Sequence, residues 1–357
     1  MTDPVPEHGR SFRLVDLMVL LAIVVLLALL LFPALQYVRE SSNQIKCSGN
    51  IRGITLACLS CNDALGSMPP YHVGPGVELD PKSYFATPGN HGSFFYFVIP
   101  FVEASYLFNL GSAPGPDGKN FNTVYMTYKP APPPPPTPGK YSPYISTGVV
   151  TDPPTPPFLG QIPVEFYQCP SDPTMPLDGL QQTAQWGACS YACNYLVFGN
   201  PNADVNTSPS IANPDGYDAK ANPPHIATSA LPKIPVSFPD GTSTTLLLAE
   251  KYSTCQWFQG GMTIEPQPGG NLWAWPGNNA SYAPAFAMEW SWNYGATFQL
   301  LPALADCNVV YPSTGHTGSM NVGMADASSR TISPRISAVT WHALCTPNGG
   351  DKVGTDF

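Results

Sequence analysis

Residues 11–40 read SFRLVDLMVLLAIVVLLALLLFPALQYVRE, and this stretch decides how the rest of the chain is organised. The sixteen residues from Leu17 to Phe32 are uncharged and mostly aliphatic, and Asp16 is the only acid near them. A helix from Leu14 to about residue 37 would be roughly 36 Å long, enough to cross a hydrocarbon core of about 30 Å. We therefore expect the remaining chain to be a domain tethered to a membrane or to a helical bundle.

A cleaved secretory signal explains this stretch less well. The apolar run of residues 17–32 is longer than the apolar core of a signal peptide, which has about 7 to 15 residues. In addition, Pro33-Ala34-Leu35-Gln36 offers no small-residue cleavage site. Charge in residues 1–10 is too balanced to set an orientation. An acid such as Asp16 costs about 2.5 to 3.5 kcal/mol at mid-membrane and usually has a partner. Alternatively, it lies at the headgroup level and stabilises the helix N-terminus.

Characteristic residues flank the apolar run. Phe12 opens a Phe-x-Leu-Val-acid pattern that ends at Asp16, Pro33 is followed by alanine, and an arm with Arg-Glu leads to Cys47-x-x-Asn50. This pattern resembles the N-terminus of type IV pilins and pseudopilins, in the form carried by DUF1559 proteins of planctomycete-type bacteria. Ser11 stands where that family has glycine.

The resemblance implies a role for each of these positions. A prepilin peptidase would cut between Ser11 and Phe12, after which Phe12 would be methylated. Asp16, one methylene shorter than the family's glutamate, would pair with the first amino group of a neighbouring subunit. Pro33 would kink the helix, because proline lacks an N–H group and clashes with the preceding turn. The sequence leaves open both a processed chain and an intact one.

The chain then divides into three parts. Residues 1–11 are a leader that a peptidase could remove, and residues 12–66 form one long helix that spans the membrane to about residue 37 and is amphipathic afterwards. Gly66 and the prolines after it predict the end of this helix. Residues 67–357 form an extracytoplasmic β-rich domain, in which the proline-rich residues 111–160 are an exposed loop insertion.

Apolar and β-branched runs locate the expected strands. Residues 92–101 suit either a buried strand or a short helix, since periodicity does not distinguish them. The strand predictions are residues 164–169, 190–199, 242–251, 320–325 and 329–332. With the long helix, these predict an α+β fold of the type IV pilin-like kind, in which the helix packs on an antiparallel β-sheet elaborated by long Pro- and Gly-rich loops.

Composition excludes one class of function. The 357 residues contain 43 prolines and 31 glycines but only 11% charged residues, and the net charge is −9. The 15 basic residues are spread thinly and form no cluster. We therefore exclude a nucleic-acid-binding protein.

Nine cysteines predict disulfides together with buried thiols, and the odd number leaves at least one thiol unpaired. The pairing cannot be read from the sequence. Cys58-x-x-Cys61 and Cys189-x3-Cys193 lack neighbouring histidines in a zinc-site spacing, so we predict no metal site. Calcium bound by loop carboxylates such as those of Asp172, Asp240 and Asp326 is an open alternative, although no EF-hand spacing supports it.

Further motifs of the resemblance recur along the chain. They are Cys-Pro-Ser-Asp, Asp-Gly-Thr-Ser-x-Thr-x-Leu-x-x-Glu and His-x9-Asp, the last with alanine in place of the family's glycine. A structural role is expected for the motif residues Cys47, Asn50, Cys169, Asp172, Asp240, Gly241, Glu250, His316 and Asp326. Because a tight turn favours positive φ after the aspartate, Ala327 predicts a longer or strained turn.

Catalysis was weighed against this structural role. The candidate residues are His316, Asp326, Glu250 and Glu289. His316 and Asp326 could form a base with its orienting carboxylate, but no nucleophile motif, zinc-peptidase motif or phosphate loop accompanies them. We therefore expect no enzyme: His316 and Asp326 tie the hairpin ends together by hydrogen bonds, and Glu250 either caps an element or pairs with Arg330 or Lys251.

These expectations define two functions. The first is a non-catalytic, pilin-like or pseudopilin subunit of an exported filament or type II secretion-like assembly. It would sit in the inner membrane by one span and associate with itself or with similar subunits. The alternative is a membrane-anchored module that binds envelope glycans through tryptophans spaced by two. Those tryptophans are Trp273, Trp275, Trp290 and Trp292.

Overall fold

The computed structural model describes most of the chain, which forms two compact units, residues 1–43 and 44–357. The described residues are 14–73, 79–80, 82–87, 90–102, 104–114, 120–123, 159–181, 186–199, 231–257, 267–275, 282–287, 297–309 and 311–357. Ser11, Phe12, Glu289, Trp290 and Trp292 lie outside them, as do the side chains of Asp16 and Pro33.

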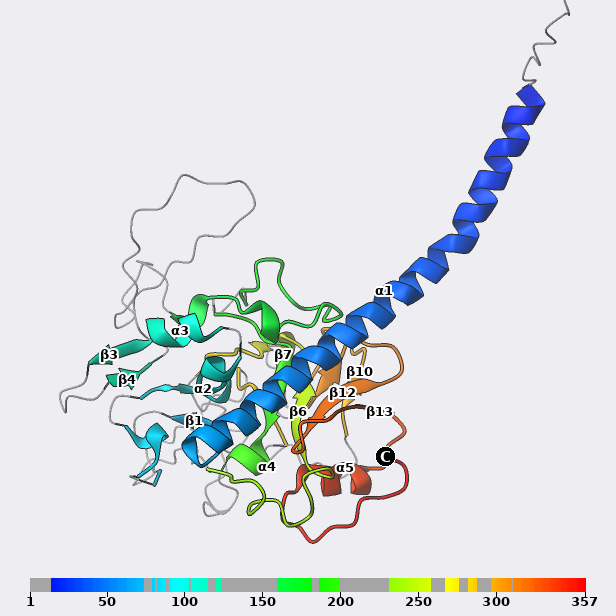
Figure 1. The fold of residues 1–357 in the computed structure, drawn as a ribbon. Coiled ribbons are helices and arrows are strands. Elements are labelled where there is room, and N and C mark those ends of the chain that lie inside the picture. The colour runs from blue at the N-terminus through cyan, green and yellow to red at the C-terminus, as the bar shows by residue number, and fades with distance from the viewer. Residues whose placement is uncertain are drawn as a thin grey trace, which may run out of the picture. The chain divides into compact units, whose positions relative to one another are not determined.

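Helix α1 runs from Leu14 to Leu65 without interruption (Figure 1). Position 33 is helical, so the proline does not end the helix, and the kink expected there stays a prediction. Gly66 ends α1 as predicted: its φ is 77°, and its N–H donates to the Asn62 carbonyl at 2.8 Å.

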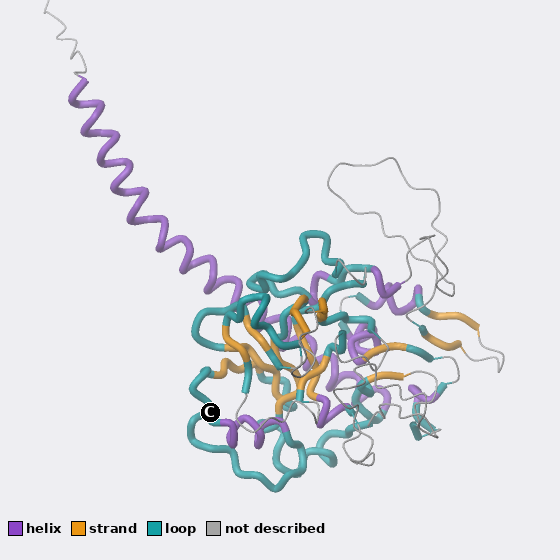
Figure 2. Tube along the Cα trace, turned by 180° about the vertical axis from the view of Figure 1, so that it is seen from behind, coloured by secondary structure: helices purple, strands orange, loops and turns teal. Residues whose placement is uncertain are grey.

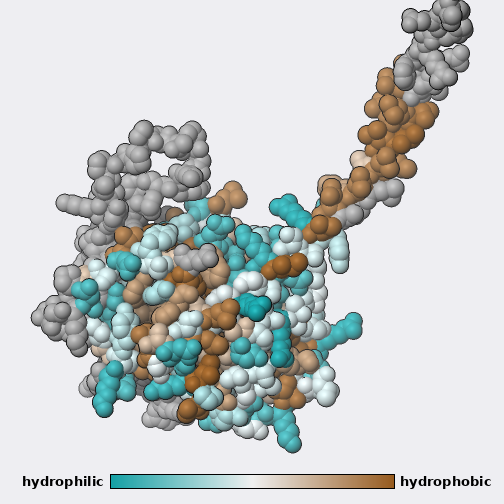
Figure 3. Space-filling view, viewed as in Figure 1, coloured by the Kyte–Doolittle hydropathy of each residue, from teal (hydrophilic) through white to brown (hydrophobic). Residues whose placement is uncertain are grey.

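In the first unit, α1 carries exposed apolar side chains. Leu14 is 72% exposed and Tyr37 79%, and the large apolar side chains described between them are at least half exposed. In Figure 3 most of the coloured atoms in this part of the helix are hydrophobic. Among the described residues, no helix combines the length and the hydropathy that a membrane crossing requires.

The second unit is organised around a five-stranded sheet with the order β13-β12-β6-β5-β9 (Figure 2). The strands are β5 Tyr191–Asn194, β6 Leu246–Glu250, β9 Ala285–Phe286, β12 Met320–Met324 and β13 Ser329–Ile332. The first three pairings are antiparallel, as predicted, but β9 runs parallel to β5. Strand β6 is central and buried throughout, which explains the apolar residues at 246–249; Glu250 at its end is buried as well.

Residues 44–65 of α1 pack directly on β12. Gly323 makes this close approach possible, since a Cβ there would lie 2.5 Å from Thr55 Cγ2 and 2.8 Å from Ile51 Cγ2. Alternate residues of β12 point the other way, and Val322 packs with Trp341 of helix α5, Ala338–Cys345. The sheet therefore lies between α1 and α5.

Replacing Gly323 with alanine is expected to lower the free energy of unfolding by about 1 to 3 kcal/mol, because the new methyl group must push α1 away from the sheet. Gly49 is the matched control. It lies on the exposed side of α1 with nothing within 4 Å of an added Cβ, so alanine there should stabilise the helix by about 0.5 to 1 kcal/mol. Chemical denaturation of both variants measures this, and equal effects would contradict the packing.

Short elements complete the unit. The helices are α2 Phe94–Val98, α3 Ser105–Leu110 and α4 Tyr195–Phe198, with 3-10 turns at Tyr84–Ala86, Ile99–Phe101, Leu159–Gln161 and Glu165–Tyr167. The short strands are β1 His72–Val73, β2 Gly92–Ser93, β3 Ser112–Pro114, β4 Asn120–Asn122, β7 Thr254–Trp257, β8 Gln267–Gly270, β10 Gln299–Leu300 and β11 Ser313–Thr314.

Several strand predictions need correction. Residues 92–101 are mainly helical, which was one of the two alternatives, and Ser93 caps α2. Residues 164–169 form a 3-10 turn rather than a strand. Strand β5 stops at Asn194 because that side chain accepts from the Leu196 N–H and starts helix α4.

The C-terminal hairpin of β12 and β13 lies where it was predicted, except that β12 ends at Met324, one residue before the predicted end at 325. Ala327 in its turn adopts φ 63°, the conformation that glycine would take without strain. Asp326 compensates, since its Oδ1 accepts from the Ser328 N–H at 2.8 Å. The strained turn expected from the alanine is thus confirmed.

Candidate functional site

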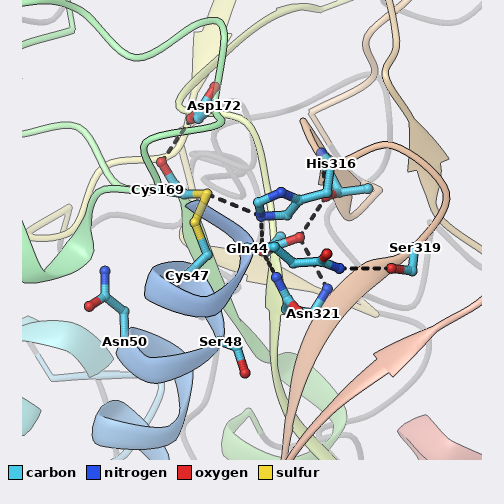
Figure 4. A network of polar contacts seen from close by, with 12 residues as sticks. Gln44, Cys47, Ser48, Asn50, Cys169, Asp172, His316, Ser319 and Asn321 are labelled. Atoms are coloured by element: carbon cyan, nitrogen blue, oxygen red, sulfur yellow. Dashed lines mark hydrogen bonds and ion pairs between the residues drawn. A yellow bond between two sulfur atoms is a disulfide. The ribbon is translucent and has the colours of Figure 1, made fainter. Parts of the chain in front are cut away.

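Four chemically reactive side chains from distant parts of the sequence meet beneath α1 (Figure 4). Cys47 of α1 forms a disulfide with Cys169, and His316 Nε2 lies 3.5 Å from the Cys169 sulfur. The same nitrogen lies 3.1 Å from Oε1 of Glu250, at the end of β6. All four residues are at most 3% exposed.

Backbone and side-chain donors hold the Glu250 carboxylate in place. Oε2 accepts from the Thr314 hydroxyl at 2.6 Å and from the Asn321 N–H at 3.1 Å. Oε1 accepts from Asn321 Nδ2 at 2.7 Å. A buried carboxylate is costly unless it is paired and hydrogen-bonded, and here both oxygens are engaged.

These contacts correct the partners expected for the motif residues. Glu250 pairs with His316 rather than with Lys251 or Arg330. The ammonium of Lys251 instead donates to the carbonyls of Ala283 and Ala285, at 2.7 and 3.0 Å. Burial lowers the pKa of Lys251 to about 7. Asp326 binds within its own turn and is not the partner of His316.

A second network surrounds Asp172. Its Oδ2 accepts from the Ser190 hydroxyl at 2.8 Å and from the Ser253 N–H at 2.9 Å. Its Oδ1 accepts from the N–H and the hydroxyl of Thr174. Burial raises the pKa of Asp172, and these hydrogen bonds oppose that shift. The carboxylate therefore joins the turn after Cys169 to β5 and to the segment after β6.

The other loop carboxylates fasten chain segments as well. Asp240, before Gly241, accepts from the N–H groups of Gly349 at 2.6 Å and Gly350 at 3.0 Å, which anchors the C-terminal tail. Asp172, Asp240 and Asp326 thus bind protein donors at three separate places, an arrangement that does not favour one shared calcium site.

The motif residue Asn50 also has a structural contact. It lies on α1, and its side chain donates to the Tyr191 hydroxyl at 3.2 Å.

Cysteines outside this cluster are structural. Cys255 and Cys307 form a second disulfide. The free thiols are all buried: Cys58, Cys61, Cys189, Cys193 and Cys345. Burial raises the pKa of Cys61 to about 12 and also raises the pKa of Cys58 well above its ordinary value. Such thiols stay protonated at neutral pH and are poor nucleophiles, so the expectation of disulfides plus buried thiols is confirmed.

The tryptophan pair does not form a sugar-stacking surface, which corrects that expectation for Trp273 and Trp275. Trp273 is 0% exposed, and its indole N–H donates to the Ile162 carbonyl at 2.8 Å. Trp275 packs against Trp186 and Tyr282, with ring centroids 5.2 Å apart in both cases. Trp273 is therefore part of the core.

Comparison with known proteins gives one match, to the family described as "Protein of unknown function (DUF1559)", over residues 36–338. The chain belongs to the DUF1559 family. The matched region contains the disulfide, the Glu250–His316 pair and the Asp172 network, and it begins after the apolar run of residues 17–32. No curated protein and no solved structure matches the chain.

Most of the motif residues of this DUF1559 domain therefore join distant segments of the chain through hydrogen bonds, an ion pair or a disulfide. The pattern missed Thr314 and Asn321, the residues that hold the Glu250 carboxylate. Asn321 follows His316 by five residues and is the second residue of β12, so the sequence alone places it near His316. No local pattern links either residue to Glu250.

Two further histidines, the buried His72 and the half-buried His91, make stability depend on pH. Burial lowers the pKa of His72 to about 3 and that of His91 to about 4. In the unfolded chain each histidine has a pKa of about 6.5 and binds a proton below that pH, whereas in the folded state it stays neutral until the pH is lower. Stability is therefore full above that pH and falls as the pH drops toward the folded-state values.

We expect His72 to reduce the free energy of unfolding by about 2 kcal/mol between pH 7 and pH 5. The His72→Gln variant should have a flatter acid limb in a plot of melting temperature against pH. His342, whose side chain is 44% exposed, is the comparison: burial lowers its pKa as well, while Asp351 opposes that shift, so His342→Gln should flatten the acid limb less than His72→Gln does. A slope unaffected by His72→Gln would contradict the assignment.

Proposed function

We propose that this DUF1559 protein is a pilin-like structural subunit of an exported filament or of a type II secretion-like assembly, and that it is not an enzyme. The observation that carries the proposal is the exposed apolar surface of residues 14–38 of α1. Because consecutive positions such as Leu17, Met18, Val19 and Leu20 are at least half exposed, the surface surrounds the helix rather than forming a stripe.

An apolar surface on all sides suits a helix that is enclosed by other helices, as in the interior of a filament. Large exposed apolar surfaces generally mark sites of interaction with other proteins or with a membrane. Before assembly, the same segment would hold the subunit in the inner membrane with residues 67–357 outside the cytoplasm. The motif around Phe12 and Asp16 supports processing by a prepilin peptidase and contact with other pilin-like subunits.

The burial of the reactive side chains supports a non-catalytic role. His316 is 0% exposed and Glu250 is 2% exposed, and both engage protein partners. An enzyme would lose turnover on His316→Ala while keeping its stability. We expect instead a lower melting temperature, because the substitution removes a buried partner of the carboxylate. The glycan-binding alternative loses support because Trp273 lies in the core.

The test is assembly of the full chain in its own cell, with the substitutions Asp16→Ala and Asp16→Glu. Alanine should abolish filaments or cross-linked oligomers, whereas glutamate, the family's usual residue, should preserve them. The melting temperature of the β-rich unit should be the same in both variants. Unchanged assembly of Asp16→Ala, or no assembly of the wild type, would overturn the proposal. Mass spectrometry of the N-terminus distinguishes a methylated Phe12 from an intact Met1.

A further inference from the structure

The Cys47–Cys169 disulfide lies beside two further ligand-type side chains. The sulfur atoms, His316 Nε2 and a Glu250 oxygen all lie within 4.8 Å of one another. A structural zinc site consists of four such nitrogen, sulfur or oxygen donors at the corners of a tetrahedron. Bond lengths near 2.0 to 2.3 Å place those donors roughly 3.3 to 3.8 Å apart. The Cys169–His316 and His316–Glu250 distances, 3.5 and 3.1 Å, are close to this spacing.

We propose that the thiol form of this cluster is a closed zinc site with Cys47, Cys169, His316 and Glu250 as its ligands. The disulfide and the metal are then alternative states of the same two sulfur atoms. With the Cα atoms 5.3 Å apart, rotation of the two cysteine side chains can separate the sulfurs while the backbone stays in place. This inference is independent of the proposed assembly function.

The surroundings of the cluster are those of a metal ligand set. The Thr314 hydroxyl and the Asn321 N–H fix the Glu250 carboxylate from the side of Oε2, while Oε1 faces His316. Outer partners of this kind orient the ligands in metal sites. In addition, Oδ1 of Asn321 is buried and has no hydrogen-bond partner, although its amide nitrogen donates to Glu250. This amide oxygen could bind a metal ion, and the same amide group already contacts Glu250, one of the proposed zinc ligands.

The donor set selects the metal. Thiolates and imidazole favour zinc over magnesium or calcium, which prefer oxygen ligands. Full burial and four protein donors leave no open position, which is typical of structural rather than catalytic zinc. The five free cysteines do not form a second site of this kind. Among the described residues, the four residues above are the only group of three or more ligand-type side chains close enough to hold one metal ion.

The exchange between the two states balances. A dithiol reductant gives two electrons and two protons to the disulfide, becomes a disulfide itself and leaves two protein thiols. Zinc binding then releases both thiol protons and forms two zinc–sulfur bonds. Oxidation by a disulfide-bearing partner reverses the sequence and expels the ion.

The test uses the full chain in mild detergent, reduced with a phosphine under denaturing conditions and refolded with or without zinc chloride. We expect the reduced chain to retain about one zinc ion after desalting and the oxidised chain to retain none. Cobalt in place of zinc should give thiolate-to-cobalt charge-transfer absorption. The Cys47→Ser/Cys169→Ser variant should lose both signals, although it keeps the other seven cysteines.

A matched control is the Cys255→Ser/Cys307→Ser variant, which removes the other disulfide and should bind zinc as the wild type does. His316→Ala should weaken zinc retention at least tenfold, roughly. The proposal is overturned if the reduced wild type retains no zinc. It is also overturned if the Cys47→Ser/Cys169→Ser variant retains as much as the wild type, since the metal would then be held by other thiols.

Discussion

Replacing Glu250 with alanine is expected to destabilise the unit of residues 44–357 by about 3 to 5 kcal/mol. The carboxylate accepts from the Thr314 hydroxyl and from two groups of Asn321, and it lies 3.1 Å from His316 Nε2. Alanine removes the acceptor that these buried groups share, and each group left unsatisfied costs about 1 to 3 kcal/mol.

The control for this prediction is another glutamate. Glu165 forms a surface ion pair with Lys46 at 3.5 Å, and its side chain is 88% exposed. Glu165→Ala should change the stability by less than about 0.5 kcal/mol. Glu250→Gln keeps the volume and one carbonyl oxygen, so its loss should be intermediate. Denaturant midpoints of the three variants measure the order, and equal midpoints for Glu250→Ala and Glu165→Ala would refute it.

Loss of the Cys47–Cys169 disulfide should have a comparable effect. The two cysteines are 122 residues apart, and closing a loop of that length stabilises the folded state by about 4 to 5 kcal/mol through the unfolded chain. Cys47→Ser should therefore lower the melting temperature of the oxidised protein. It should also loosen residues 44–65 of α1, which hydrogen exchange would detect as faster exchange.

Reduction supplies the control. In a reducing buffer with a chelator present, the wild type also lacks the cross-link and any bound metal, so its stability should match that of Cys47→Ser. A difference that persists under those conditions would mean that the serine acts through packing. No difference in the oxidised proteins would mean that the disulfide does not contribute through the unfolded state.

The features that could be predicted from the sequence were set by neighbouring residues. Gly66 ends α1 because a residue with positive φ must follow the last turn. The apolar run of β6 and the limits of the β12–β13 hairpin follow from burial and turn chemistry in the same way. These are local effects, for which a sequence window contains most of the information.

The remaining features depend on contacts between distant residues. The segment at 164–169 has strand-forming residues, yet it forms a 3-10 turn whose Tyr167 hydroxyl donates to the Phe95 carbonyl. The site is similar: His316 contacts Glu250 and Cys169, at sequence separations that no periodic pattern connects. A sequence motif identified these residues as a set, but not their partners.

The covalent link between α1 and Cys169 also matters for mechanical load. A pull on the helix passes through Cys47 directly to Cys169, so the chain between the two cysteines bears no tension. That loop corresponds to about 400 Å of extended chain. While the bond is intact, the subunit can lengthen only by unfolding the segments outside this loop. Once the bond is broken, the chain between the two cysteines can also extend.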